Sequence, residues 1–226
     1  MKVFYHSDND GKCAGYLVRK LNKLTDNFDD EYIKINYGME FPFDSIGKNE
    51  IVYIVDYSIL PEEMDRLLEI TKNVIWIDHH KSAIARYENY DKKIDGLRYD
   101  GIAGCMLTYC YLQYLVNGVE FSTDLTKTAQ TFIKLIADYD VWTFKYGDTT
   151  RKFQKGFELY PHEPLNRIWD ELEEESRITS TLMLNEILNK GNTIIEYRKN
   201  MMKDYNIFII NKRINLIFLQ ISSSLY

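Results

Sequence analysis

The chain has 226 residues, which is enough for one large domain or for one domain and part of another. Hydrophobic residues make up 45% of it and charged residues 27%, so a core can form without disulfide bonds. The net charge of −6 argues against a protein that wraps long duplex DNA, because such proteins carry an excess of basic residues. It does not exclude a short or single-stranded nucleic acid.

Cysteine usage and the N-terminal sequence bear on the compartment. Cys13, Cys105 and Cys110 form no CxxC pair, and their odd number argues against a disulfide framework. A reducing cytoplasm is the simplest expectation. The first residues lead directly into a strand-like run and do not resemble a signal peptide. No run approaches the roughly 20 apolar residues of a membrane helix, so no membrane association is expected.

Strand and helix signals alternate along the first half of the chain. Hydrophobic spacing and punctuation predict strands at 2–6, 32–37, 51–55 and 73–77, with helices at 12–24 and 61–70. Such alternation is typical of parallel strands joined by crossover helices. We therefore predict an α/β fold with a mostly parallel, Rossmann-like sheet of about five strands and helices on both faces.

The second half is predicted to be largely helical. Helices are expected at 103–116 and 125–137, the pattern weakens between 147 and 164, and a long polar helix is expected at 182–205. Two apolar runs, at 207–210 and 214–221, are predicted to be strands joined at 211–213, because they are rich in isoleucine and phenylalanine.

Polar side chains follow three of the predicted strands where each strand ends. His6, Asp8 and Asp10 follow the first, Asp56 follows the third, and 78–80 (Asp-His-His) follow the fourth. In an open α/β sheet, ligands bind beyond the carboxyl ends of the strands. The fold is therefore expected to bring these residues to one edge.

Each segment also has a plainer interpretation. The DND sequence with Gly11 is a common turn, and Asp56 alone is often a helix cap. Adjacent histidines behind a buried strand are less ordinary, because neutral imidazole is a frequent metal ligand. Asp138 and Asp140 end the predicted helix at 125–137, where a carboxylate opposes the helix dipole, although either could simply cap a loop.

Taken in order, these segments resemble the four motifs of the DHH phosphoesterase family over roughly residues 1 to 145. The sequence from His6 to Gly11 is similar to the first motif, and Asp56 to the single aspartate of the second. The third motif, which names the family, is Asp-His-His at 78–80. Asp138 matches the fourth motif better than Asp140, because the family aspartate ends a helix.

The resemblance implies a role for each residue. His6 and Asp8 would bind one divalent ion, Asp10, His79 and Asp138 the other, and Asp56 both. His80 would contact the phosphate, with Asp78 behind it. Mixed oxygen and nitrogen ligands suit Mn²⁺ best, with Mg²⁺, Co²⁺ or Zn²⁺ as alternatives. Two such ions hydrolyse phosphodiesters through an activated water.

The resemblance also implies a division of the chain. Residues 1–145 would form the DHH catalytic domain and 146–205 a helical connector. Residues 206–226 would form a docked hairpin or the start of a C-terminal domain. The glycine-rich GGGH-like motif of the family's C-terminal substrate domain is missing from this sequence.

The expected function is hydrolysis of short oligonucleotides or nucleotide signals, because the segment 138–142 resembles the nanoRNase-like branch. Alternatives are a catalytically weak binding or regulatory module, a RecJ-like single-strand exonuclease and a pyrophosphatase. An oligomer is compatible with the sequence.

Overall fold

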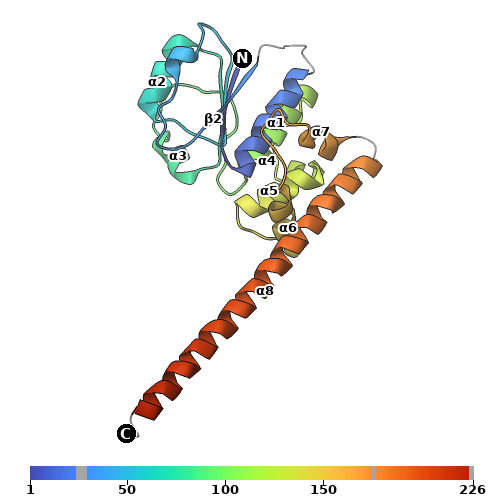
Figure 1. Cartoon of the computed structure of the whole chain (residues 1–226). Coiled ribbons are helices and arrows are strands. Elements are labelled where there is room, and N and C mark those ends of the chain that lie inside the picture. The colour runs from blue at the N-terminus through green and yellow to red at the C-terminus, as the bar shows by residue number, and fades with distance from the viewer. Residues whose placement is uncertain (24–29, 175–176, 224–226) are drawn as a thin grey trace.

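A four-stranded parallel sheet forms the centre of the protein (Figure 1). The computed structural model describes residues 1–23, 30–174 and 177–223, with the side chains of 23, 177–179 and 204–223 outside that description. The strand order is β2-β1-β3-β4. The strands are β1 (Lys2–His6), β2 (Glu31–Ile35), β3 (Val52–Val55) and β4 (Val74–Ile77). This α/β architecture confirms the predicted fold class, with four strands where about five were expected.

Helices cover both faces of the sheet. One face carries α1 (Asn9–Lys23), α4 (Gly104–Asn117) and α5 (Thr131–Asp140), and the other carries α2 (Pro61–Ile70) and α3 (Lys81–Arg86) (Figure 1). Successive strand residues point to opposite faces, so Tyr5 and Val55 join the core on the α1 side while Phe4 and Ile54 join the other. Strands that are buried on both faces have continuous apolar sequences, which is why these strands could be predicted from the sequence.

An extended segment lies where a fifth strand would be. Asp95 pairs with Ile75, and Arg98 with Asp78, as isolated parallel bridges beside β4. The Trp76 amide donates to the Asp95 carbonyl at 2.9 Å. This segment shields the exposed edge of β4 without being long or regular enough to count as a strand.

The predicted helix at 125–137 is broken in two. A short 3-10 turn, η2 (Leu125–Thr128), precedes α5, and Gln130 between them is extended. The hydroxyls of Thr126 and Thr128 donate to backbone carbonyls three residues earlier. Threonine side chains that bond to nearby backbone compete with a continuing helix, which explains the interruption. The second piece runs on to Asp140, three residues beyond the predicted end.

The C-terminal third is helical. It contains α6 (Asp148–Phe157), α7 (Ile168–Glu173) and α8 (Arg177–Ser223), of which α8 begins against α6 and α7 and then extends away from the body (Figure 1). The two strands predicted at 207–210 and 214–221 are wrong, because the backbone there continues α8. No glycine or proline occurs after Gly191 to stop a helix, and isoleucine lowers helix propensity only slightly. Residues 224–226, the end of the segment 206–226 that was predicted to form a docked hairpin or the start of a C-terminal domain, lie outside the described residues.

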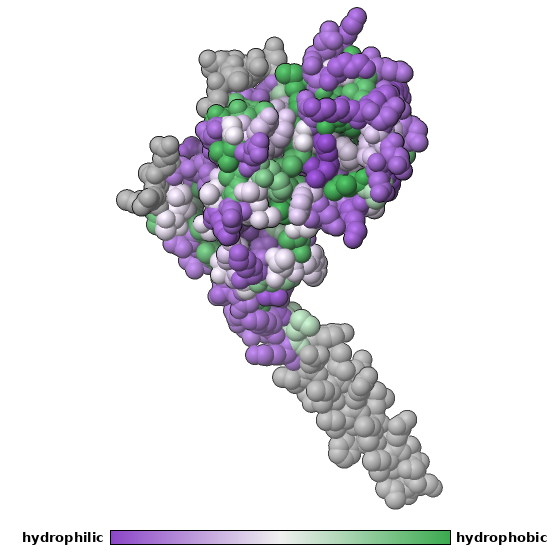
Figure 2. All heavy atoms as spheres, turned by 180° about the vertical axis from the view of Figure 1, so that it is seen from behind, coloured by the Kyte–Doolittle hydropathy of each residue, from purple (hydrophilic) through white to green (hydrophobic). Residues whose placement is uncertain are grey.

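The surface mixes polar and apolar side chains. In Figure 2, seen from behind, hydrophilic side chains gather at the upper right, on the side of α2 and α3. Across the described part of the chain, no helix is both long enough and apolar enough to span a membrane.

Candidate metal centre

The carboxyl ends of three neighbouring strands bring the predicted motifs to one edge of the sheet. Tyr5 is paired in register with Val55, and Val55 with Ile77. The residues that follow these three, His6, Asp56 and Asp78, therefore leave the sheet at the same level. The convergence of the first three motifs follows from strand order and register alone.

Asp56 lies between two imidazoles. Its Oδ1 is 3.2 Å from Nε2 of His79, and its Oδ2 is 3.7 Å from Nδ1 of His6. The side chain is only 1% exposed, and neither oxygen has a hydrogen-bond partner among the described residues. A buried carboxylate without hydrogen-bond donors is costly, and the chemistry of this arrangement suits a cation ligand.

The backbone of Asp56 is also strained. Its φ of 52° lies in the left-handed region, which a residue with a Cβ seldom adopts. Its amide donates to the Ile77 carbonyl at 2.9 Å, which fixes this turn to the neighbouring strand. Strain of this kind persists only where the surroundings enforce it and is concentrated at functional sites.

One group of candidate ligands lies on the β1 side of Asp56. Nδ1 of His6 is 2.8 Å from Oδ2 of Asp8, and these two residues with Asp56 offer three ligand atoms within 4.8 Å of one another. Oδ1 of Asp8 accepts the amide of Gly11 at 2.9 Å, near the start of α1. A Cβ on Gly11 would lie 2.3 Å from the His6 carbonyl oxygen, so close approach of α1 to β1, rather than a turn, requires this glycine.

A second group lies on the β4 side. Nε2 of His79 is 3.3 Å from Oδ2 of Asp140 and 3.7 Å from Oδ2 of Asp10. These three residues again offer ligand atoms within 4.8 Å of one another. Oδ2 of Asp140 is buried and has no hydrogen-bond partner among the described residues, like the oxygens of Asp56.

Asp10 is oriented by the N-terminus of α4. Its carboxylate accepts the amides of Gly104 at 2.6 Å and Cys105 at 2.9 Å. A helix N-terminus favours a negative charge through its free amides and its dipole. Asp10 therefore reaches the second group with its orientation already fixed.

Gly104 is a site residue that sequence reasoning missed. A Cβ there would lie 2.7 Å from the Cβ of Asp56 and 3.0 Å from Oδ2 of Asp10. Only glycine lets the α4 backbone come this close to both carboxylates. The sequence 101–104 (Gly-Ile-Ala-Gly) at a predicted helix start was the available signal, but nothing in it linked the glycine to residues about fifty and ninety positions away.

Asp78 contacts His80 and stays behind the cluster. Its Oδ1 lies 2.6 Å from Nδ1 of His80 and accepts the amide of His79 at 2.8 Å. Asp78 is fully buried, whereas the His80 side chain is 31% exposed. Hydrogen bonding to Asp78 raises the pKa of His80 and engages its Nδ1, so Nε2 is the ring nitrogen that remains for a ligand.

Of the two fourth-motif aspartates, the structure places Asp140 in the cluster and Asp138, the predicted ligand, outside it. The Asp138 carboxylate accepts the Thr143 hydroxyl at 2.6 Å, the Lys145 amide at 2.7 Å and the Tyr146 amide at 3.2 Å, as well as the Thr150 hydroxyl. Burial acts to raise the pKa of Asp138, but these four donors outweigh it and lower the pKa. Asp140, the alternative, occupies the position beside His79.

Two residues apart on a helix, Asp138 and Asp140 cannot face the same way, because side chains repeat every 3.6 residues. Asp138 instead fastens the loop that follows α5. Trp142 and Phe144 in that loop have φ of 54° and 47°, an unfavourable backbone that the hydrogen bonds to Asp138 help to hold.

The electrostatics of the cluster favour a bound cation. Burial, followed by repulsion from neighbouring carboxylates, raises the pKa of Asp10 and Asp56 well above the usual range, and that of Asp140 to about 7. Asp56 and Asp8 raise the pKa of His6 to about 10. Without a cation, the cluster therefore retains protons at neutral pH that a divalent ion would displace.

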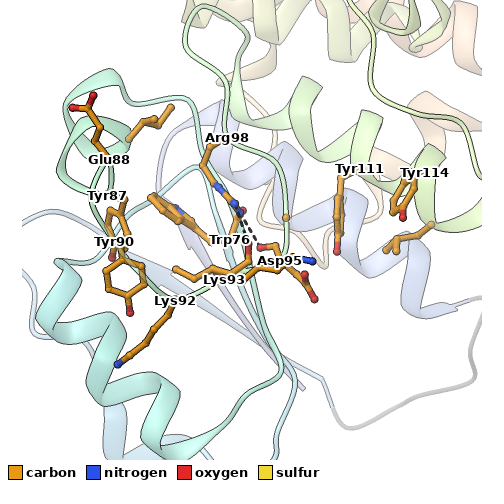
Figure 3. A pocket seen from close by; sticks show the side chains of 14 residues that line it. Trp76, Tyr87, Glu88, Tyr90, Lys92, Lys93, Asp95, Arg98, Tyr111 and Tyr114 are labelled. Carbon is orange, nitrogen blue, oxygen red and sulfur yellow. Dashed lines mark hydrogen bonds between the residues drawn. The ribbon is translucent and has the colours of Figure 1, made fainter.

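A cavity of about 670 Å³ lies elsewhere in the protein. Tyr87 and Tyr90 lie on one side of it and Tyr111 and Tyr114 on the other, with Arg98 between them (Figure 3). None of the clustered carboxylates or histidines lines it. Among the described residues, the groups that could hold a metal ion all lie in the strand-end cluster and none lies in this cavity.

Comparisons with known proteins identify one similar structure. No protein-family model matches the chain, and no curated protein matches it significantly. Among solved structures, the chain is similar to the exonuclease RecJ bound to manganese, with a TM-score of 0.45 and 16% sequence identity. The match covers 90% of this chain and 64% of that protein, less than two thirds of its length.

Proposed function

We propose that the protein is a metal-dependent phosphodiesterase that uses two divalent ions. The observation that carries this proposal is the placement of Asp56, whose two buried, unpartnered oxygens face His79 on one side and His6 on the other. A carboxylate that directs one oxygen toward each of two imidazole-containing groups is suited to bind two metal ions at once. The sequence resemblance to the DHH phosphoesterases supports the same interpretation.

The donor set fits two ions. His6, Asp8 and Asp56 would hold one, and Asp10, His79 and Asp140 the other, with Asp56 shared. Carboxylate oxygens with one imidazole per ion suit Mn²⁺, and also Mg²⁺, Co²⁺ or Zn²⁺. When bound, two ions activate a water molecule and neutralise the charge of a phosphoryl group.

The protein's own residues would prepare and orient the phosphate. His80, with Nδ1 held by Asp78 and its pKa raised, would carry a proton on Nε2 and donate it as a hydrogen bond to a phosphoryl oxygen. Asp10, fixed by the amides of α4, would keep the second group of ligands in place. The substrate would be a phosphodiester in a short oligonucleotide or a nucleotide signal.

The test measures hydrolysis of bis(4-nitrophenyl) phosphate and of a dinucleotide with Mn²⁺ and with chelator. We expect Mn²⁺-dependent turnover of both by the native protein. Asp56→Asn should reduce turnover by orders of magnitude, because the loss of one member of a group of residues that act together removes most of their joint effect. Asparagine is nearly isosteric with aspartate, so a purely structural role would tolerate this change at a cost of about 1 kcal/mol or less.

Asp44→Asn is a matched control, because Asp44 is a fully exposed aspartate in the 3-10 turn η1 (Phe43–Ser45) and belongs to none of the candidate ligand groups. It should retain native turnover and Mn²⁺ binding. Binding of Mn²⁺ with no hydrolysis of either substrate would instead favour a binding or regulatory module. An Asp56→Asn protein with native turnover would contradict the two-ion proposal.

A further inference from the structure

A trough beside the cluster is lined by Ile102, Ala103, Lys134, Val141, Lys145 and Tyr146, among others, and has a volume of about 340 Å³. Ala103 immediately precedes Gly104, whose amide donates to Asp10, and Val141 immediately follows Asp140. One wall of the trough therefore begins one residue from Gly104, which holds Asp10, and the other wall begins one residue from Asp140. None of the candidate ligands lines the trough itself. The volume falls at the lower end of the range of about 300–1,000 Å³ that is usual for small-molecule sites.

Within the described part of the chain, two of the three lysines that line the trough lack a carboxylate partner, and the one carboxylate in the lining, Asp138, already accepts four hydrogen bonds. Lys134 and Lys145 appear in no ion pair among the described residues, whereas Lys127, also in the lining, is paired with Asp124 at 2.6 Å. Unpaired lysines beside an acidic cluster, in a chain of net charge −6, suit an anion that extends beyond the ions.

The position of Lys134 indicates which part of a substrate it would serve. It precedes Asp140 by six residues on α5, which corresponds to about 9 Å along the helix axis. This separation is too long for a phosphate held at the cluster to reach Lys134 directly. A second phosphate, one nucleotide further along a chain, would lie within reach of the flexible lysine side chain.

The loop that closes the trough is rigid and aromatic. Four hydrogen bonds to Asp138 hold residues 143–150. The backbone amides of Lys145 and Tyr146 donate two of these bonds, which fixes the backbone of both residues. Nζ of Lys145 lies 5.8 Å from the centre of the Tyr146 ring, and Tyr146 is 40% exposed. An exposed ring next to a cation is the combination on which nucleobases stack beside their phosphates.

We propose that this trough binds the nucleotide next to the scissile phosphate, with Lys134 and Lys145 on its phosphate and Tyr146 against its base. The inference rests on the proposed function and narrows it. The substrate is a single-stranded nucleotide chain of at least two residues, and inorganic pyrophosphate, which has neither base nor second nucleotide, is a poor one. Asp138 is then a positioning residue for the trough.

The experiment compares the native protein with the double variant Lys134→Ala/Lys145→Ala. A 5′-phosphorylated dinucleotide reaches the trough, whereas bis(4-nitrophenyl) phosphate has no second phosphate. Loss of hydrogen bonds to a charged group should raise KM for the dinucleotide roughly tenfold or more. The kcat/KM for the small ester should fall much less. Lys72→Ala, an exposed lysine before β4 at the opposite end of the sheet, is the control and should change neither value.

The dissociation constant of a phosphorothioate dinucleotide, measured by calorimetry, tests the trough independently of whether the protein hydrolyses a substrate. If the native protein hydrolyses neither substrate, the proposed function fails, but weaker binding by the double variant than by Lys72→Ala still supports the trough. Equal dinucleotide KM and equal dissociation constants in the native and double-variant proteins would overturn the trough. An equal loss for the dinucleotide and the small ester would also overturn it, because that outcome indicates general damage to the cluster.

Discussion

Gly104 at the start of α4 leaves no room for a side chain against Asp56. A Cβ at Gly104 would lie 2.8 Å from Oδ1 of Asp56, the oxygen that faces His79. Asp56 is itself held in a left-handed backbone conformation with a φ of 52°. The two residues therefore fix each other, and the position of the Asp56 carboxylate depends on a residue about fifty positions later in the chain.

Gly104→Ala should displace Asp56 and weaken Mn²⁺ binding. Overpacking of this kind costs about 1–3 kcal/mol, which corresponds to a loss of affinity of roughly tenfold or more if the strain falls on the ligands. Mn²⁺ affinity measured by calorimetry checks this. Gly47→Ala is the control, because a Cβ there would lie 3.4 Å from the flexible end of Glu50 and should have no effect on the ions. Native affinity in Gly104→Ala would show that the close approach is not needed.

Asp138→Asn should destabilise the protein while leaving Mn²⁺ binding intact. The carboxylate accepts four hydrogen bonds. An asparagine side chain has only one acceptor oxygen, and its NH₂ group would face some of the same N–H and O–H donors. The free energy of unfolding should fall by about 1–3 kcal/mol. Denaturant unfolding and Mn²⁺ titration on the same sample give both quantities. A loss of Mn²⁺ binding greater than that of Asp140→Asn would restore Asp138 as the ligand.

Asp140→Asn should show the opposite pattern. Asp140 is a partly buried carboxylate beside Asp10, and burial together with that charge raises its pKa to about 7. Removing its charge should leave the metal-free protein as stable as the native one or more so, and should weaken binding of the ion near His79. The melting temperature with chelator and with Mn²⁺ measures both effects. A strongly destabilised metal-free protein would contradict this assignment.

The fold was readable from the sequence wherever local pattern and tertiary structure agree. Strands buried on both faces give apolar runs, so β1, β3 and β4 and the residues after them were found almost to the residue. Parallel order then places His6, Asp56 and His79 at one edge without further information. The resemblance of the motifs to those of the DHH family added the expectation that Asp56 binds both metal ions.

The sequence predictions differ from the structure where contacts between distant segments determine the local conformation or the direction of a side chain. Asp138 matched the fourth motif better than Asp140 in the sequence, but the hydrogen bonds from Thr143, Thr150 and two loop amides turn Asp138 away from the cluster. Gly104 matters because of a contact between distant segments, which no local pattern encodes. The runs at 207–210 and 214–221 contain strand-favouring residues, but they continue a helix that begins at Arg177.

The metal-free protein should be more stable at about pH 6 than at about pH 9. The pKa of Asp140 is raised to about 7, so the cost of its charge is fully present above that pH and disappears as the pH falls toward the value of unfolded aspartate, about 3.9. The pKa of His6 is raised to about 10, so its contribution is fully present below about 6.5 and is lost as the pH rises through 10.

Both shifts therefore act in the same direction between these two pH values. Melting curves in chelator measure the difference, and saturating Mn²⁺ should abolish or reverse it, because ligand binding requires deprotonated carboxylates and a neutral imidazole. An unchanged melting temperature across this range in chelator would contradict the electrostatic description of the cluster.

Anomalous diffraction from crystals soaked in Mn²⁺ tests the shared role of Asp56 most directly. We predict two manganese peaks about 3.5–4 Å apart, one near His6 and Asp8 and one near His79 and Asp140, with one oxygen of Asp56 on each. Absence of manganese from the cluster, or a single ion that Asp56 does not contact, would contradict the proposed two-ion centre.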